Sequence, residues 1–205
     1  IVVGWMGRPL EDKGLMTLPY LLAENPRIVV RAWTGAETAG LDYTLRVQGE
    51  AMEAVMKLAR KLGVEDRLDI RPLDFNALSY RHRLDGCHVL LGNSRKEGFL
   101  LTAAEALSCG IPVVVTKTCG IADFIKNGQN GYLIDWNDNP RRLAKVAHRA
   151  VLKAVKLDAV KAVLCHGVDV AVHVRRDVGV VVLRADAAGG SRKGGVGHVW
   201  GQREG

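Results

Sequence analysis

The sequence lacks any window approaching the roughly 20 consecutive apolar residues that a transmembrane helix needs, so membrane contact is expected to be peripheral. It also lacks the charged n-region and small-residue cleavage site of a signal peptide. The chain opens on Ile1, inside an apolar strand pattern, and not on Met. We therefore interpret it as part of a longer cytoplasmic protein, with membrane-peripheral attachment as an open possibility.

Cysteine is scarce and shows no pairing pattern. Cys87, Cys109, Cys119 and Cys165 are widely spaced and form no CxxC pair. None of the six histidines completes a ligand set with zinc-like spacing. The pattern predicts buried, reduced thiols and no metal site. We expect no tightly bound cofactor.

The composition is that of a water-soluble globular domain, with 48% hydrophobic and 25% charged residues in 205. The net charge of +7 is unevenly distributed. Residues 141–205 hold 13 Lys and Arg against 5 Asp and Glu, whereas residues 1–140 hold 16 against 17. A basic tail can bind nucleic acid or anionic lipid, or remain solvated. We consider nucleic-acid binding unlikely.

Short apolar runs alternate with segments of helical periodicity along residues 1–157. Strands are predicted at Ile1–Trp5, Ile28–Trp33, Leu68–Ile70, Val89–Leu91, Pro112–Thr116 and Tyr132–Ile134. Helices are predicted at Leu15–Ala23, Ala51–Leu62, Ala77–Leu84, Leu101–Ser108 and Ile121–Ile125, and from Pro140 with Asn139 as N-cap. Repeated alternation predicts a doubly wound, Rossmann-like α/β domain with a parallel sheet.

Residues 158–205 follow a different pattern. Alternating valines in Val168–Val174 resemble an isolated strand, and Gly189–Gly205 is basic and low in complexity. We interpret 158–205 as an atypical basic tail, irregular or disordered, that is not necessarily native to the fold.

Parallel sheets of this class bind ligands at the carboxyl ends of their strands. The loops after Trp5, Trp33, Leu91 and Thr116 should therefore form the site. The first of these carries GWMGRPLEDKG, in which Gly7 permits close approach of a ligand and Arg8 and Lys13 could hold a diphosphate. Solvated surface cations are the alternative interpretation.

The segment Asn93–Thr116 is the most informative one. Seven residues separate Glu97, in the predicted loop, from Glu105, in the predicted helix. Both carboxylates can accept hydrogen bonds from hydroxyl groups. Between them, the helix start should offer free backbone N–H groups for an anion. These donors belong to Leu100, Leu101 and Thr102. The spacing suits a ligand of the form sugar–diphosphate–ribose.

Taken in order, these segments resemble the C-terminal domain of family 4 retaining glycosyltransferases, which have the GT-B fold and an E-x7-E signature. GR followed by KG matches Arg8 and Lys13, which would contact the donor diphosphate. EGFLLTAAEAL matches the signature, with Glu97 at the hexose hydroxyls and Glu105 at the ribose hydroxyls. CGIPVVVTKTCGIADFI and NGQNGYLI match later parts, so the resemblance spans about residues 1–155.

The resemblance implies transfer of a hexosyl group from a UDP-, GDP- or ADP-sugar to a hydroxyl acceptor, which could be a glycan, a lipid or a small molecule. Glu97, Arg8 and Lys13 would be catalytic. The implied donor-binding set is Gly7, Arg8, Lys13, Glu97, Gly98, Phe99, Leu100, Leu101, Thr102 and Glu105. The N-terminal, acceptor-binding half of such enzymes is absent from this sequence. A donor-binding fragment without turnover and a sugar-nucleotide epimerase of GT-B shape are therefore the alternatives.

Two departures from the family pattern concern the region after the second predicted strand. TGAETAG keeps Gly35 but places Glu37 where the family often has a second glycine. The segment Thr38–Gln48 is less regular than usual, so no base or sugar contacts are transferred to it.

Overall fold

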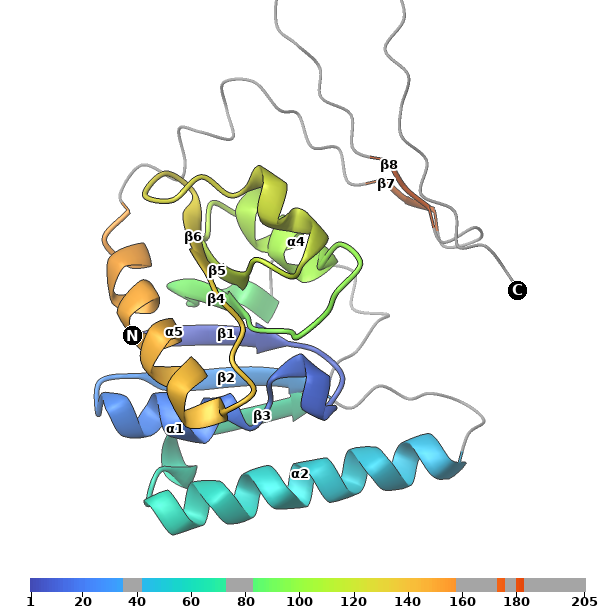
Figure 1. Cartoon of the computed structure of the whole chain (residues 1–205), viewed down its shortest axis with the longest axis vertical. Coiled ribbons are helices and arrows are strands. Elements are labelled where there is room, and N and C mark those ends of the chain that lie inside the picture. Colours follow the sequence, from blue (N-terminus) through green and yellow to red (C-terminus); the bar gives the residue numbers. More distant parts are fainter. Residues whose placement is uncertain (35–41, 73–82, 158–172, 176–179, 183–205) are drawn as a thin grey trace, which may run out of the picture.

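Six parallel strands form the central sheet of the computed structural model, which describes residues 1–34, 42–72, 83–157, 173–175 and 180–182. The strands are β1 Val2–Met6, β2 Val29–Thr34, β3 Leu68–Pro72, β4 Val89–Gly92, β5 Val113–Thr116 and β6 Gly131–Ile134. Their order is β3-β2-β1-β4-β5-β6 (Figure 1). The predicted fold class and all six predicted strands are confirmed.

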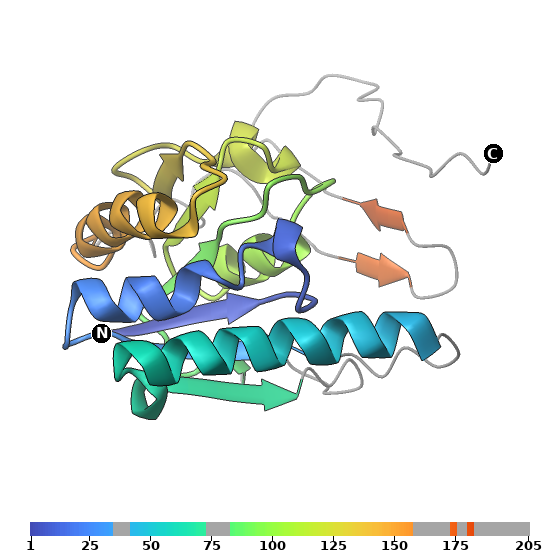
Figure 2. The same cartoon turned by 60° about the horizontal axis from the view of Figure 1, so that its bottom comes forward.

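Helices cover both faces of this sheet. The α-helices are α1 Thr17–Glu24, α2 Asp42–Leu62, α4 Leu101–Ser108 and α5 Pro140–Ala154. Three short 3-10 helices are η1 Glu11–Lys13, η2 Glu65–Arg67 and η3 Gly120–Phe124. The helices α1, α2 and α5 pack on one face, and α4 packs on the other with η3 (Figure 2).

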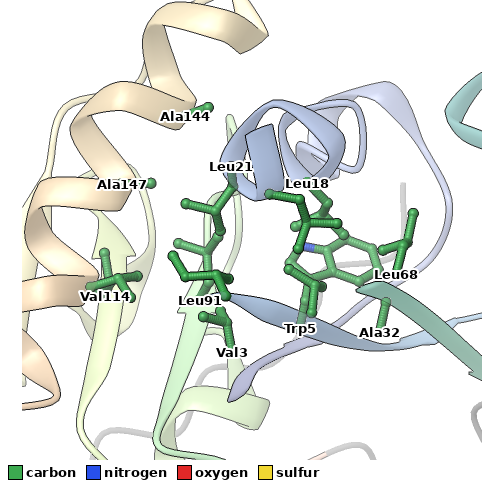
Figure 3. Close-up of a cluster of buried hydrophobic side chains, with 14 of the residues drawn as sticks. Val3, Trp5, Leu18, Leu21, Ala32, Leu68, Leu91, Val114, Ala144 and Ala147 are labelled. Carbon is green, nitrogen blue, oxygen red and sulfur yellow. The ribbon is translucent and has the colours of Figure 1, made fainter. Parts of the chain in front are cut away.

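The core explains why the strands are almost continuously apolar. Every residue of β4 and β5 is buried, as expected for parallel strands that are covered on both faces. Under α1 and α5, Leu18, Leu21 and Ala147 meet Val3 and Val114 from the sheet (Figure 3). Burial of this apolar surface fixes the strand order, and hence which loops lie next to each other.

The helix predictions were right for α1, α4 and α5, although α1 begins at Thr17 and not at Leu15, and they needed correction elsewhere. At α5, the Asn139 side chain accepts hydrogen bonds from the backbone N–H groups of Arg141 (3.0 Å) and Arg142 (3.2 Å), as an N-cap does. The predicted Ala77–Leu84 helix lies mostly outside the described residues. The predicted helix at Ile121–Ile125 is the 3-10 helix η3, too short to form an α-helical ladder.

The helix α2 begins at Asp42 and not at Ala51, so the stretch that looked irregular is largely helical. Gly49 lowers helical propensity by roughly 1 kcal/mol relative to Ala, which disguised the N-terminal half of this helix in the sequence. Packing overrides that preference because Val55 and Ala59 are fully buried in the main core.

Two further strands, β7 His173–Arg175 and β8 Val180–Val182, pair with each other in antiparallel fashion, apart from the six-stranded sheet. The strand expected near Val168–Val174 is therefore paired and not isolated where the structure describes it. The remainder of 158–205 lies outside the described residues. Across the described part of the chain, no helix combines the length and apolarity needed to span a membrane.

Candidate donor-binding site

The loops after β1 and β4 meet at the carboxyl edge of the sheet, where these two strands are neighbours. The chain leaves β1 toward β2 and leaves β4 toward β5, so the connections diverge at this point. Such a switch point leaves a crevice between the loops in doubly wound sheets. The predicted loop after β2, which contains Gly35 and Glu37, lies outside the described residues.

The clearest feature of this edge is an ion pair between Lys13 and Glu97. Lys13 Nζ donates to Glu97 Oε2 at 2.8 Å and to the Lys96 carbonyl oxygen at 3.3 Å. The Lys13 side chain is 11% exposed and that of Glu97 is 28% exposed, so water screens the pair only partly. Two residues that the sequence assigned to one ligand are thus in direct contact.

The loop after β5 supports the Glu97 loop from its other side. The backbone N–H of Gly120 donates to the Glu97 carbonyl oxygen at 3.3 Å, and that of Ile121 donates to the Phe99 carbonyl oxygen at 3.0 Å. A Cβ on Gly120 would overlap the Gly98 carbonyl oxygen. Gly98 itself faces open space. The loop after β5 therefore holds the backbone of the Glu97 loop, and space remains next to Gly98.

The N-terminus of α4 adjoins this loop. Its N-cap, Leu100, has φ 69° and ψ 68°, a left-handed conformation that is unusual outside glycine, and its side chain is buried against Gly92. In this part of the structure, no side chain caps the helix. In the first turn, the backbone N–H of Ala103 donates to the Leu100 carbonyl oxygen at 3.0 Å. The N–H groups of Leu101 and Thr102 come before the first helical hydrogen bonds and can attract anions.

Glu105 lies further along α4 and is half-buried. Burial raises the pKa of its carboxyl, and the positive charge of Arg83 lowers that pKa by a smaller amount. Among the described residues, no hydrogen bond or ion pair joins the Glu105 side chain to the Lys13–Glu97 pair. In the described structure, Glu97 is paired with Lys13, whereas Glu105 is near Arg83.

Arg8 and Gly7 are placed differently from Lys13. Arg8 is exposed and forms no ion pair with any residue that the structure describes. The Gly7 N–H donates to the Trp33 carbonyl oxygen at 3.1 Å, and an added Cβ would lie 3.2 Å from the Trp5 ring. Gly7 thus allows close packing on the indole.

Sequence reasoning missed Asn93, which is completely buried directly after β4 and bonded to Trp5 and Gly14. An asparagine at the end of a strand usually marks a turn, and nothing in its sequence neighbourhood indicates burial.

Over the described ranges, no group of three or more His, Cys, Asp or Glu side chains is arranged to hold a metal ion.

Comparison with known proteins gives consistent matches. The family model described as "Glycosyl transferases group 1" matches residues 21–159. A D-inositol 3-phosphate glycosyltransferase from Streptomyces bingchenggensis is 34% identical over 151 residues, which cover 69% of this chain and 30% of the relative. An N-acetyl-alpha-D-glucosaminyl L-malate synthase from Bacillus anthracis is 31% identical over 112 residues, covering 54% and 28%. The chain thus spans about a third of the length of these relatives.

Solved structures share the fold. Anabaena HepE in complex with UDP and glucose superposes with a TM-score of 0.62 at 20% identity, covering 79% of this chain and 42% of that one. The C-terminal domain of a group 1 glycosyl transferase from Francisella tularensis superposes with a TM-score of 0.56 at 18% identity. That match covers 76% of this chain and 83% of the Francisella chain.

Proposed function

This chain belongs to the Glycosyl transferases group 1 family, and we propose that it is the donor-binding half of a retaining, family 4-like glycosyltransferase. It would bind a nucleoside-diphosphate sugar, whose hexosyl group passes to a hydroxyl acceptor with retention at the anomeric carbon. The observation that carries the proposal is the 2.8 Å contact between Lys13 Nζ and Glu97 Oε2 at the carboxyl edge of β1 and β4. A cation and a carboxylate there match the phosphate and hydroxyl groups of a sugar diphosphate.

The roles follow from charge and position. Lys13, Arg8 and the N-terminus of α4 would hold the diphosphate and stabilise the negative charge that develops on it as it leaves. Glu97 would orient the hexose hydroxyls, and Glu105 would accept hydrogen bonds from the ribose hydroxyls. Because the protein supplies this positive charge, the mechanism needs no metal ion. We also propose that the protein is cytoplasmic and binds its donor in that compartment.

A donor-binding unit without turnover is the second candidate, because the chain covers only 30% of the length of its Streptomyces relative. One experiment separates a transferase from a binding unit and from an epimerase. The chain is combined with the N-terminal half of a group 1 relative, and radiolabelled UDP-, GDP- and ADP-glucose are supplied as donors. A labelled glycoside with the anomeric configuration of the donor would support the transferase. Donor binding without any product would support the binding unit, and rearranged donor without an acceptor would support an epimerase.

The two glutamates should respond differently to substitution. We expect Glu105→Ala to weaken binding of UDP and of UDP-glucose alike, because it removes an acceptor for ribose. Glu97→Ala should weaken binding of UDP-glucose only. Its loss releases the Lys13 ammonium from the 2.8 Å ion pair, so bare UDP should bind at least as tightly as to the parent.

Titration calorimetry with both ligands checks this difference. Glu11→Ala is the matched control, since it removes one exposed carboxylate from the neighbouring turn. Equal losses of UDP affinity in Glu97→Ala and Glu105→Ala would refute the assignment of Glu97 to the hexose and of Glu105 to the ribose of the donor.

We also propose that residues 1–157 are the folding unit and that 158–205 lie outside it. The six-stranded sheet and every donor-site residue precede residue 158. Deleting 158–205 should therefore leave the thermal unfolding midpoint and UDP affinity nearly unchanged. Calorimetric scans of both chains test this expectation, and loss of soluble protein on truncation would show that the tail completes the fold.

A further inference from the structure

A buried asparagine, Asn93, joins three segments behind the donor site. Its side chain is 0% exposed. Asn93 Oδ1 accepts a hydrogen bond from Trp5 Nε1 at 2.9 Å, and Asn93 Nδ2 donates one to the Gly14 carbonyl oxygen at 2.9 Å. An indole N–H can only donate and a carbonyl oxygen can only accept, so these partners fix the orientation of the amide. A buried amide with both ends bonded is a rigid link.

The link acts on the turn that carries Lys13. Gly14 follows Lys13 and ends η1 with a φ of 73°. On the other side of Lys13, the backbone N–H of Arg95 donates to the Asp12 carbonyl oxygen at 2.6 Å. The segment that begins with Asn93 therefore holds the carbonyl oxygens of Asp12 and Gly14, the two residues that flank Lys13. From this turn the lysine reaches Glu97 with only 11% of its side chain exposed.

We infer that Asn93 is a positioning residue that fixes the Lys13 turn, and through it the ammonium group beside Glu97. The value of this role for donor binding rests on the proposed function. A lysine side chain has a large rotamer entropy, and ordering it when a ligand binds would weaken affinity. The Gly14 bond reduces that loss because it orders the turn before the donor arrives.

The two bonds of Asn93 can be broken separately. Asn93→Asp keeps an oxygen for Trp5 Nε1 but presents a second oxygen to the Gly14 carbonyl, to which an ionised carboxylate cannot donate a hydrogen bond. Trp5→Phe removes the indole donor and leaves the Asn93–Gly14 bond in place. Both changes disturb the core, so Trp5→Phe is the control for loss of stability. Asn93→Ser, uncharged and too short to span the gap to Gly14, runs in parallel in case the aspartate variant does not fold.

The first readout is ligand-free: the rate of Lys13 reductive methylation, measured by peptide mass spectrometry with exposed Lys126 as internal reference. In Asn93→Asp and Asn93→Ser the rate at Lys13 should rise severalfold, and in Trp5→Phe it should stay close to that of the parent. Equal rises in all three variants, or none in the Asn93 variants, would overturn the inference. This outcome does not depend on which donor binds.

The second readout is UDP affinity in a double-mutant cycle with Lys13→Ala. Asn93→Asp alone should weaken UDP binding about tenfold, which corresponds to 1.4 kcal/mol. In the Lys13→Ala background it should have little further effect, because Asn93 acts through Lys13. Full additivity would overturn the inference. Tight UDP binding that is indifferent to Lys13→Ala would instead contradict the proposed function and leave the methylation result standing.

Discussion

Replacing both Arg8 and Lys13 by alanine should weaken binding of UDP by about two to four orders of magnitude while leaving uridine binding nearly unchanged. A charge-assisted hydrogen bond contributes roughly 1.5–3 kcal/mol, or about one to two decades of affinity for each residue. Lys13 is largely buried beside Glu97, whereas Arg8 is exposed and must swing to reach the phosphate. We therefore expect the Lys13 substitution to account for the larger share.

A control with the same change of charge is available on α2. Lys57 and Arg60 are exposed on the helix face away from the sheet, so their double alanine variant also removes two positive charges. Calorimetry should show UDP affinity close to that of the parent in this control. Added salt should weaken UDP binding to the parent more than to the Arg8/Lys13 variant, since the screened contacts are then absent. If both double variants bind UDP alike, the GRPLEDKG loop is ordinary surface.

Gly14→Ala should be among the most destabilising single changes in the donor site. Gly14 has a φ of 73°, and a Cβ there would overlap the Asn93 carbonyl oxygen and approach the Asn93 amide nitrogen at 2.5 Å. The left-handed conformation costs roughly 1–2 kcal/mol outside glycine. With the clash added, we expect the free energy of unfolding to fall by about 3–5 kcal/mol and UDP affinity to fall with it, because the Lys13 turn must move.

Gly63 provides the matched comparison for that substitution. It has a φ of 64°, but a Cβ there meets nothing within 4 Å. Gly63→Ala should therefore lose only about 1–2 kcal/mol of unfolding free energy and no UDP affinity. Urea unfolding and UDP titration of the two variants measure both effects. Equal losses of stability would show that backbone conformation alone, and not crowding by Asn93, limits the residue at position 14.

The parts that the sequence predicted well are those set by local patterning. The bounds of α4, Leu101–Ser108, match the prediction, and Asn139 caps α5 as expected, because periodicity and capping are read over a few neighbouring residues. The early start of α2 was missed because tertiary packing outweighed the low propensity around Gly49.

Within the candidate site, local sequence pointed to the loops after β1 and β4 but not to the contacts between them. Lys13 and Glu97 are 84 positions apart, and only the strand order brings β1 and β4 side by side. Asn93 could not be predicted at all, because both of its partners come from the other end of the chain. The left-handed backbone of Leu100 was also unpredictable, since its stability depends on packing against Gly92.

The most direct test of the account is thermal unfolding of the parent chain over increasing concentrations of UDP-, GDP- and ADP-sugars. A ligand that binds only the folded state raises the unfolding midpoint with concentration by mass action. We predict that at least one of the three nucleotide sugars raises the midpoint progressively, and that the Arg8/Lys13 double variant abolishes the effect. No concentration-dependent rise with any of them, or a rise that survives in that variant, would contradict a nucleotide-sugar site at the carboxyl edge of β1 and β4.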